Sequence, residues 1–248
     1  MSWITNLVRV AVLALLVLFL VWPELFEPMF APLTRNGAPA IYTRQSLFTL
    51  AWHHLAIVAA ATLAAGIVAV GMAILVTREA GAELLPFARS VVNIGQTFPP
   101  VAVLALAVPV FGFGTWPTLI ALFLYALLPI FENTLTALTT LPRDVIEAAR
   151  GAGMSGFQKL MQIELPLSVP LILAGVRIAV VISLATATIG STVAASTLGE
   201  VIIAGLLSNN TAFVLQGGLV VAVMAVLLHD ALMLMERRLA RSIDNQTD

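Results

Sequence analysis

"EAARGAGMSGFQKLMQIELP", residues 147–166, is a charged insert in an otherwise strongly apolar chain. Its four charged residues are Glu147, Arg150, Lys159 and Glu164. The stretches on both sides of it are long, apolar and largely free of charge. Because hydrocarbon solvates charges poorly, we expect the insert to lie outside a membrane. There, a bent helical segment can fit into a groove on another protein.

The composition is that of an integral membrane protein. The chain has 248 residues, of which 60% are hydrophobic and 10% charged, and its mean hydropathy is +1.02. Soluble domains are about 45–50% apolar and about 25% charged. The net charge of −1 does not suggest a nucleic-acid partner, and the lack of cysteine excludes disulfides and thiolate metal sites. His53, His54 and His229 have no ligand-like spacing, which argues against a metal enzyme.

The uncharged stretches are long enough for several membrane helices. About 20 apolar residues cross the roughly 30 Å of hydrocarbon in a bilayer. Residues 55–76 carry no charge, and residues 90–131 carry none over a length that suits two helices. The turn-forming run "GFGTWP", residues 112–117, divides the longer stretch. We predict six membrane helices, at about 7–22, 50–77, 91–111, 116–139, 167–193 and 212–235.

The positive charges predict the orientation of these helices. With a cytoplasmic N-terminus, nine Lys and Arg residues fall on the cytoplasmic side and two on the outer side. The nine are Arg9, Arg78, Arg89, Arg143, Arg150, Lys159, Arg237, Arg238 and Arg241, and the two are Arg35 and Arg44. Cytoplasmic loops of membrane proteins carry an excess of Lys and Arg. Both termini and the charged insert are therefore expected on the cytoplasmic side.

The charged insert is expected to form two short helices. Asp144 can cap the first, and Gly151 and Gly153 are expected to end it. Ser155 can cap the second, and Pro166 suits the first turn of the membrane helix that follows. The predicted structure is a bent pair of short helices with small residues at the bend.

The spacing of seven residues in this segment resembles a known motif. The seven are Glu147, Ala148, Ala149, Gly153, Ile163, Leu165 and Pro166. They match every defining position of the EAA motif of ATP-binding-cassette (ABC) importer permeases. The resemblance implies an all-α, polytopic membrane protein with the type I ABC importer permease (MetI-like) fold. It also implies that the insert is the coupling helix, which in that family docks into a cleft of the ATPase subunit.

The resemblance extends over about residues 45–235. Four runs are similar to the branch of the family that imports glycine betaine, choline, carnitine and related osmoprotectants: "IGQTFPPVAVLALAVP" (94–109), "LIALFLYALLPIFENT" (119–134), "LPLSVPLILAGVRIAVV" (165–181) and "TATIGSTVAASTLGEVIIAGL" (186–206). One difference is "AASTLG", residues 194–199, where many members have "GAGGLG". We expect one permease domain, residues 1–248, with its core at about 45–235 and a cytoplasmic coupling loop at about 140–166.

The resemblance also implies partners. These are a second permease chain, identical or homologous, two ATPase subunits and an extracytoplasmic substrate-binding protein, assembled in a bacterial inner membrane. The chain has no G-x-x-x-x-G-K-[ST] run, so ATP and Mg²⁺ are expected on the partner ATPase. We expect this chain to be a transport subunit with no catalytic residue and no bound cofactor or metal.

Polar, uncharged residues in the predicted helices are candidates for the substrate path. They are Gln96, Thr97, Tyr125, Thr188 and Ser191. Pro99 and Pro100 remove backbone donors beside the first two, and the resulting kink either is structural or shapes the path. The hydroxyls of the fifth helix either line the path or bond to the preceding turn. An uncharged route suits a quaternary ammonium solute, whereas an amino-acid importer would be expected to present a fixed charge.

Several charged or titratable residues are expected to have structural roles. Arg177 is the cation within a predicted span, and it either faces the path or, as we favour, reaches the lipid headgroups. Glu132 is expected at the cytoplasmic end of its helix. His53 and His54 follow Trp52, and we expect them to anchor the outer interface.

Other functions remain open. An importer of another small polar solute, such as an amino acid, would share the fold, whereas a channel or secondary carrier would need no coupling motif. "GMSG", residues 153–156, also matches the G-x-S-G of rhomboid proteases, with Ser155 as nucleophile and His229 as base. A general base must reach its serine, and Ser155 lies in a charged loop where nothing places His229. This protease interpretation is therefore disfavoured.

Overall fold

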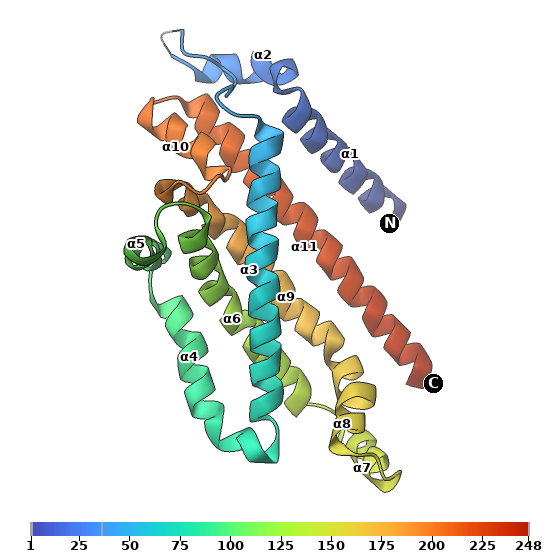
Figure 1. The fold of residues 1–248 in the computed structure, drawn as a ribbon. Helices are drawn as coiled ribbons and strands as arrows, with labels where there is room; N and C mark the ends of the chain where they lie inside the picture. Colours follow the sequence, from blue (N-terminus) through green and yellow to red (C-terminus); the bar gives the residue numbers. More distant parts are fainter. Residues whose placement is uncertain (1, 36, 248) are drawn as a thin grey trace. The chain divides into compact units, whose positions relative to one another are not determined.

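The computed structural model describes residues 2–35 and 37–247, and for Ser2 and residues 242–247 it describes the backbone alone. That part of the chain is helical and contains no strand (Figure 1). The longer helices are α1 (Ser2–Val21), α3 (Leu47–Val76), α4 (Leu85–Thr97), α5 (Pro100–Phe111), α6 (Thr115–Thr139), α7 (Arg143–Gly151), α9 (Leu165–Ala187), α10 (Gly199–Leu207) and α11 (Thr211–Thr247). The shorter elements are η1 (Pro23–Phe26), α2 (Glu27–Phe30), η2 (Ala31–Leu33), η3 (Glu79–Leu84), α8 (Gly156–Lys159), the π-helical turn η4 (Leu160–Glu164) and η5 (Thr188–Val193).

Helix length and composition agree with the predicted number of membrane spans. Within the described residues, five helical segments are long and apolar enough to cross a membrane: Trp3–Val21, Leu47–Val76, Thr115–Thr139, Gly156–Val193 and Thr211–Arg241. A sixth span results if the bent pair formed by Glu79–Thr97 and Pro100–Phe111 crosses the membrane as one unit. The helical segment that contains the fifth span begins at Gly156, within the charged insert, and so begins before the predicted residue 167.

The predicted helix at 91–111 is broken rather than kinked, which corrects the sequence prediction. α4 ends at Thr97, Phe98 is extended (φ −79°, ψ 133°), and α5 begins at Pro100. Neither Pro99 nor Pro100 has an N–H group to donate to the preceding turn. The proline ring also disfavours the helical conformation of the residue before it, which explains the extended backbone of Phe98. Two consecutive prolines thus end one helix and start the next.

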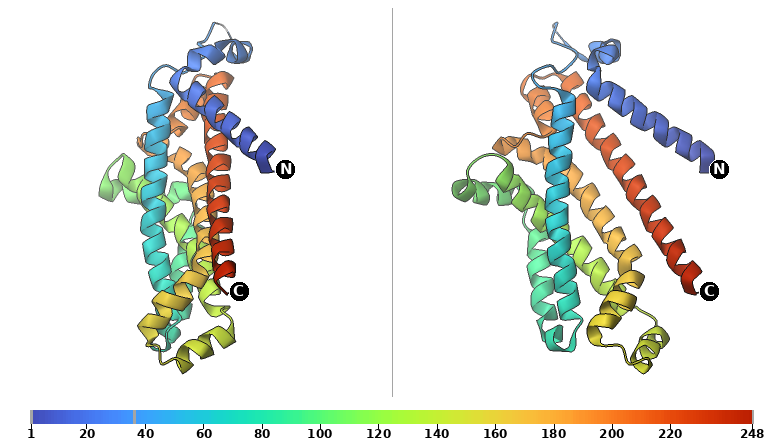
Figure 2. Two further views of the ribbon diagram at one scale, coloured as in Figure 1. Left: turned by 90° about the vertical axis from the view of Figure 1, so that its right-hand side faces the viewer. Right: turned by 45° about the vertical axis from the view of Figure 1, so that its right-hand side comes forward.

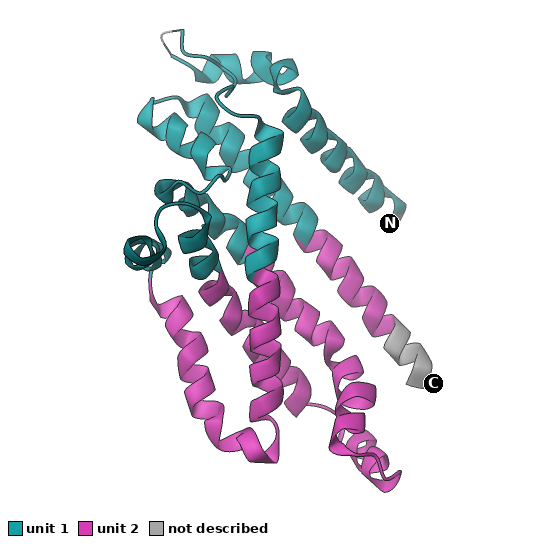
Figure 3. Cartoon of the chain, viewed as in Figure 1, with its two compact units in different colours: residues 1–61, 99–122, 182–228 teal, residues 62–98, 123–181, 229–248 magenta. Residues whose placement is uncertain are grey.

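The described chain divides into two compact units (Figure 3). Unit 1 comprises residues 1–61, 99–122 and 182–228, and unit 2 comprises residues 62–98, 123–181 and 229–248. The long helices α3, α6, α9 and α11 contribute to both units. The charged insert belongs to unit 2, and the loop before α3 belongs to unit 1.

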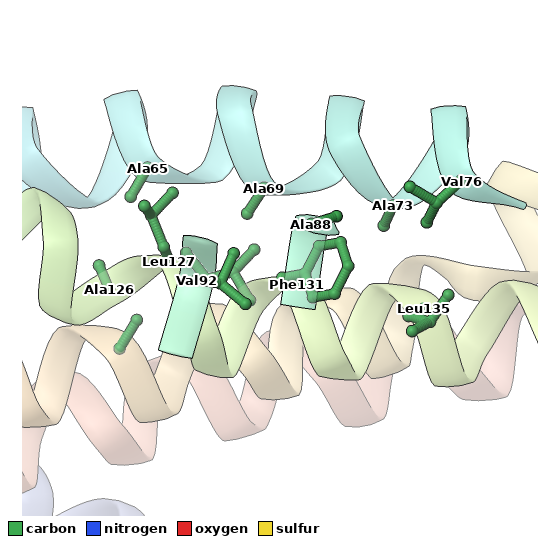
Figure 4. Packing of buried hydrophobic residues seen from close by; sticks show 12 residues of the cluster. Ala65, Ala69, Ala73, Val76, Ala88, Val92, Ala126, Leu127, Phe131 and Leu135 are labelled. Atoms are coloured by element: carbon green, nitrogen blue, oxygen red, sulfur yellow. The ribbon is translucent and has the colours of Figure 1, made fainter. Parts of the chain in front are cut away.

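The core of unit 2 is built on small residues of α3. Ala65, Ala69 and Ala73 are fully buried and lie one helical turn apart. Buried residues of three other helices belong to the same cluster: Ala88 and Val92 from α4, Ala126, Leu127, Ile130, Phe131 and Leu135 from α6, and Ala179 from α9. Figure 4 shows the alanines of α3 on the side that faces Val92, Leu127 and Phe131. Small residues at this spacing let helices approach closely within a membrane, where the hydrophobic effect does not drive helix association. The alanines of α3 therefore determine how closely the helices of unit 2 pack.

Glycines bring two further helices of unit 2 against the backbone of α6. A Cβ atom on Gly95 of α4 would lie 2.3 Å from the carbonyl oxygen of Leu124. A Cβ atom on Gly175 of α9 would lie 2.7 Å from the carbonyl oxygen of Pro129. Because any larger residue at either position would push the helices apart, both glycines are required for close packing.

In unit 1 the loop before α3 is tied to α10 and α11. The side chain of Gln216, which is fully buried, accepts a hydrogen bond from the N–H of Tyr42 (3.1 Å) and donates one to the carbonyl of Ala40 (2.6 Å). The Tyr42 hydroxyl donates to a carboxylate oxygen of Glu200 (2.6 Å). Burial, and then this hydrogen bond, raise the pKa of Tyr42, so the phenol remains neutral and can donate. These contacts fix the loop to the start of α10.

His54 corrects another expectation, because it is fully buried instead of lying at an interface. Its Nδ1 accepts a hydrogen bond from the N–H of Leu198 (3.4 Å), and its Nε2 donates to the carbonyl of Leu184 (3.0 Å). Since a backbone N–H only donates and a carbonyl only accepts, these partners require the neutral imidazole with its proton on Nε2. His54 therefore holds the segment before α10 against the end of α9. Nδ1 of the neighbouring His53 lies 3.2 Å from the hydroxyl oxygen of Ser196.

Candidate functional site at the charged insert

The seven motif residues lie in four parts of unit 2. Glu147, Ala148 and Ala149 are on α7, Gly153 is in the turn that follows, Ile163 is in η4, and Leu165 and Pro166 open α9. In both views of Figure 2, the yellow-green α7 and the yellow α8 lie at the same end of unit 2 as the turn near residues 78–85. The motif is thus gathered at the end of unit 2 where α3 also ends.

The start of α7 differs from the prediction. Its N-cap is Pro142, without a side-chain capping bond, and its first residue is Arg143. Asp144 lies in the first helical turn, so the prediction that Asp144 caps the helix is wrong. The fixed φ of Pro142, here −57°, suits the chain entry to a helix, and the negative charge of Asp144 interacts favourably with the N-terminal end of the helix dipole.

The end of α7 confirms the predicted role of the glycines. The helix ends at Gly151, and Gly153 adopts a left-handed conformation with φ +75°. The N–H of Gly153 donates to the carbonyl of Arg150 (2.9 Å), and the N–H of Met154 donates to the carbonyl of Ala149 (3.2 Å). This pair of bonds is the Schellman motif, in which a left-handed glycine reverses the chain. The bend in the insert therefore depends on Gly153.

The second short helix is capped as predicted but does not end as predicted. The Ser155 hydroxyl accepts from the N–H of Gln158 (3.3 Å), and the Gln158 side chain accepts from the N–H of Ser155 (2.9 Å), which is a capping box. The N–H of Leu165 then bonds to the carbonyl of Leu160, five residues earlier, and the helix continues through this π turn into α9. Pro166 lies in the first turn of α9, as predicted, and it follows the π turn, where the α-helical bonding is already interrupted.

A cleft of about 880 Å³ lies between the insert and the ends of α3 and α6 in unit 2. Its charged lining residues are Arg78, Glu79, Arg143, Glu147, Arg150, Lys159 and Glu164. Its apolar lining includes Val76, Leu135, Leu138 and Ile146. Both charged residues of α7 in the insert, Glu147 and Arg150, therefore line this cleft.

One carboxylate in the cleft is buried and contacts two cations. The Glu164 side chain is 7% exposed, and its Oε2 lies 2.6 Å from Nη2 of Arg78. Its Oε1 lies 3.4 Å from Nζ of Lys159. Sequence reasoning missed this pairing because Arg78 and Glu164 are 86 residues apart and no local pattern links them.

Two apolar side chains at the start of the second helix are exposed. Phe157 is 68% exposed and Met161 is 46% exposed. Because they are four residues apart in a helical run, they lie on the same side. Sequence reasoning missed this pair as well, although its helical spacing within a polar segment is visible. Aromatic residues and methionine are enriched in protein–protein interfaces, so this pair is a candidate contact surface.

The path candidates of unit 2 lie near the end of α4, where the helix breaks before Pro99. Nε2 of Gln96 donates to the carbonyl of Tyr125 (3.2 Å), and the Tyr125 hydroxyl donates to the carbonyl of Phe98 (2.5 Å). The Thr97 hydroxyl bonds to the carbonyl of Asn93 in its own helix (2.9 Å). Gln96 and Tyr125 thus join the broken end of α4 to α6.

The path candidates of unit 1 make local contacts. The Thr188 hydroxyl donates to the carbonyl of Ala185 (2.7 Å). The Ser191 hydroxyl lies 2.7 Å from the Thr197 hydroxyl. Thr188 and Ser191 belong to unit 1, whereas Gln96, Thr97 and Tyr125 belong to unit 2.

Two cations within helices of unit 2, Arg177 and Arg89, have acidic partners. Nε of Arg177 lies 3.2 Å from a carboxylate oxygen of Glu236 on α11. Nε of Arg89 lies 3.1 Å from a carboxylate oxygen of Glu132. Neither pair is predictable from a local pattern, because the partners lie 59 and 43 residues apart in the sequence.

Comparison with known proteins identifies the family. A family model described as a binding-protein-dependent transport system inner membrane component matches residues 69–245. The chain belongs to this family. It is therefore a multi-pass membrane component of a binding-protein-dependent transport system. Membership in a transport family favours the permease interpretation over the protease, and the Ser155 hydroxyl serves as a helix cap.

Curated relatives of this transport component match most of its length. It is 38% identical to the osmoprotectant import permease protein OsmY of Salmonella typhimurium, over 82% of this chain and 87% of that protein. It is 38% identical to the carnitine transport permease protein OpuCB of Listeria monocytogenes, over 78% and 88%. It is 32% identical to the glycine betaine/carnitine/choline transport system permease protein OpuCB of Bacillus subtilis, over 85% and 93%.

A solved structure confirms the fold of this transport component. A chain of the inward-facing MetNI methionine ABC transporter aligns with a TM-score of 0.66 over 79% of this chain and 95% of that chain. The two sequences are 22% identical, so this similarity establishes the fold alone. The predicted type I importer permease fold is confirmed.

Proposed function

We propose that this chain is the membrane-spanning subunit of an ATP-driven importer for quaternary-ammonium osmoprotectants such as glycine betaine. The observation that carries the proposal is the likeness to permeases named for osmoprotectants, carnitine, choline and glycine betaine. They match this chain at 31% to 38% identity over most of their own length. Such a match covers the membrane helices as well as the coupling motif.

The charged insert is the part that would contact the ATPase. Glu147, Ala148, Ala149, Gly153, Ile163, Leu165 and Pro166 form its motif. Exposed Phe157 and Met161 would add apolar contact area, since buried aromatic residues contribute strongly to protein interfaces. ATP and Mg²⁺ would be bound by the ATPase partner alone.

The proposed complex has two permease chains, identical or homologous, two ATPase subunits and an extracytoplasmic binding protein. ATP binding would close the ATPases and displace the inserts that are docked on them. The run from α8 through η4 into α9 is helical without interruption, so displacement of the insert would move a membrane helix directly. Such rigid-body movement is a common mechanism for switching between two states of a transporter.

The candidate path suits a solute of this class. A quaternary ammonium group donates no hydrogen bonds, and proteins hold it by cation–π contact with aromatic faces. We place this tight recognition on the binding protein, so that the permease needs only an uncharged route. Gln96, Thr97, Tyr125, Thr188 and Ser191 are polar and uncharged. Arg177, which lies within α9, is paired with Glu236 and so offers no free charge to an amino acid.

The proposal is tested by measuring ATP hydrolysis of the purified permease–ATPase complex in nanodiscs. The cognate binding protein is added with glycine betaine, choline, carnitine or each of a panel of amino acids. We expect the quaternary ammonium solutes to stimulate hydrolysis and the amino acids to have no effect. Stimulation by an amino acid alone would overturn the substrate assignment, and the absence of a copurifying ATPase would overturn the coupling assignment.

A further inference from the structure

We infer that Glu164 is a positioning residue that transmits movement of the charged insert to helix α3. This inference rests on the proposed function, because it concerns how an ATPase-driven displacement reaches the membrane helices. Glu164 is not one of the seven motif residues. It is assigned here from its burial and its two cationic partners in unit 2.

Glu164 lies at a break in regular helical geometry. It is the last residue of the π turn between α8 and α9, and it is 5% exposed as a whole residue. A π turn contains one more residue than an α turn, so it changes the direction in which the following side chains point. Such turns occur frequently at functional sites. The turn gives a buried carboxylate access to the end of α3, which is far away in the sequence.

Arg78 fixes the other side of this contact. It follows α3, and its Nε donates to the carbonyl of Ile74 in the last turn of that helix (3.3 Å). Its Nη2 also donates to the hydroxyl of Thr77 (3.2 Å) and to Glu164 (2.6 Å). The guanidinium therefore binds the free carbonyl end of α3 and the π turn at once, and a planar group with five donors is suited to this task.

Lys159 brings α8 into the same cluster. Its ammonium lies 3.4 Å from the second oxygen of Glu164. One carboxylate thus joins the end of α3 to α8 and to the start of α9. Ionic hydrogen bonds are stronger than neutral ones, and removal of one partner leaves a buried charge without compensation. The cluster is therefore expected to keep the three segments together when the insert moves.

Two connections then lead from the second half of the insert to membrane helices of unit 2. One is covalent, from α8 through η4 into α9. The other is ionic, from Glu164 to the end of α3, whose alanines Ala65, Ala69 and Ala73 pack against α4 and α6. If the ionic connection is lost, the insert can still dock and move α9, but α3 no longer follows. ATP hydrolysis then continues with less transport per ATP.

The experiment uses the reconstituted complex with its ATPase and binding protein. Glu164→Gln keeps the shape of the side chain and removes its charge. We expect unchanged ATPase copurification and a fall of about five-fold in glycine betaine transported per ATP hydrolysed. Glu132→Gln is the matched control, because it removes an ion pair with Arg89 in the same unit, outside the insert. The control should retain the wild-type ratio.

The double variant Arg78→Gln/Glu164→Gln separates positioning from stability. With both charges removed, Arg78 no longer presents a charge to a neutral partner, and Lys159 alone loses its ion pair, so we expect a melting temperature closer to wild type than that of Glu164→Gln. The transport ratio should remain low because the connection to α3 is still missing. A wild-type ratio in Glu164→Gln, or recovery of the ratio in the double variant, would overturn the inference.

A second readout requires no substrate. Spin labels on cysteines at Glu83, in η3, and at Gly151, at the end of α7, report the separation of the α3 end from the insert. The chain contains no other cysteine. We expect one narrow distance distribution in the wild type and a broader one in Glu164→Gln, and equal widths would contradict the inference. If wild-type complex fails to transport glycine betaine, the proposed function fails, whereas this readout still decides the role of Glu164.

Discussion

At the scale of single residues, two left-handed backbone positions can be compared, one occupied by glycine and the other by alanine. Gly153 has φ +75° and Ala194 has φ +64°. A Cβ atom in this conformation costs about 1–2 kcal/mol, which glycine avoids. The sequence resemblance matches position 194 to the first glycine of "GAGGLG", and the φ of Ala194 explains why glycine would suit that position. Ala194 accepts this strain, whereas the motif of the insert retains its glycine.

Gly153→Val should impair coupling through backbone strain. No atom lies within 4 Å of a Cβ atom built on Gly153, so a clash within the chain does not contribute. A β-branched residue at φ +75° is strained, and the turn after α7 should shift. We expect the permease to insert in the membrane but to retain less ATPase on copurification.

Gly151→Ala is the matched control for this substitution. Gly151 lies at the end of α7 and also has open space around it, but it has ordinary helical geometry. Alanine is favoured over glycine in a helix by about 0.5–1 kcal/mol, so this variant should keep its ATPase. Equal ATPase retention by the valine and alanine variants would argue against a role for the bend.

Tyr42→Phe should destabilise unit 1 in a pH-dependent manner. The variant loses the hydrogen bond to the Glu200 carboxylate, which we expect to cost about 1–3 kcal/mol. Because the pKa of Tyr42 is raised in the folded protein, the unfolded phenol ionises first as the pH rises above its ordinary value of 10.0. The wild type therefore loses stability above about pH 10, whereas the phenylalanine variant does not titrate there.

The measurement is thermal unfolding in detergent, followed by circular dichroism. The melting temperature of Tyr42→Phe should lie below that of the wild type by a constant amount up to about pH 9, and the difference should narrow above about pH 10. A difference that widens at alkaline pH would contradict the assignment of the hydroxyl as donor.

At the scale of the elements, the helices and caps that the sequence predicted correctly are those that depend on a single physical rule. Long uncharged stretches predicted the membrane helices, since hydrocarbon imposes a length and excludes charge. Ser155 was correctly predicted as a cap because the capping box is local. The prediction that Asp144 caps α7 was wrong because Pro142 fixes an earlier start. An aspartate is favourable both at the N-cap and in the first turn of a helix, so the residue type of Asp144 alone could not distinguish the two positions.

Other features depend on contacts that sequence patterns do not contain. The π turn at Leu160–Glu164 accompanies an ion pair with a residue 86 positions away. α10 was not predicted, because residues 201–228 contain no charged residue that would separate two helices in the sequence. The turn after α10 contains Asn209, which has a left-handed φ of +52°. Asparagine favours turns, so the pair Asn209–Asn210 could have predicted the end of α10 from the sequence.

The exposed face of α8 leads to a prediction about docking. Phe157→Ala should leave the fold intact, because the side chain is 68% exposed. It should weaken binding of the ATPase by about ten-fold or more if the ring is buried in the complex. Binding is measured by titrating the purified ATPase onto the permease in nanodiscs.

Phe113→Ala provides the comparison for Phe157→Ala. Phe113 is 74% exposed and lies in the turn before α6, outside the insert. We expect this variant to bind the ATPase as the wild type does. Equal affinities for both variants and the wild type would show that the exposed ring of α8 takes no part in docking.

At the scale of the whole molecule, the positive charges predict an orientation that can be measured. The absence of cysteine allows single labelling sites to be introduced. Ala31→Cys lies in the exposed segment between α1 and α3, and Gly151→Cys lies at the end of α7. In intact cells, an impermeant thiol reagent should label the first and not the second. Labelling in the reverse pattern, or of both, would contradict the predicted topology.

The type I permease fold was predictable from seven residues at fixed spacing, because the motif belongs to a family whose helices share one arrangement. The substrate class rests on broader likeness, since the path candidates Gln96, Thr97, Tyr125, Thr188 and Ser191 carry no signature of a particular solute. Their hydrogen bonds within the protein explain their polarity without a ligand. Recognition of the solute therefore has to be measured on the assembled transporter.

The most direct test of the account is uptake of radiolabelled glycine betaine into proteoliposomes. These contain the permease, its ATPase and its binding protein, with ATP and Mg²⁺ supplied on the ATPase side. Choline, carnitine and a panel of amino acids are measured in parallel, and a non-hydrolysable ATP analogue serves as the control. We predict ATP-dependent accumulation of at least one quaternary ammonium solute and none of the amino acids. Accumulation of an amino acid while glycine betaine, choline and carnitine all remain outside would contradict the central claim.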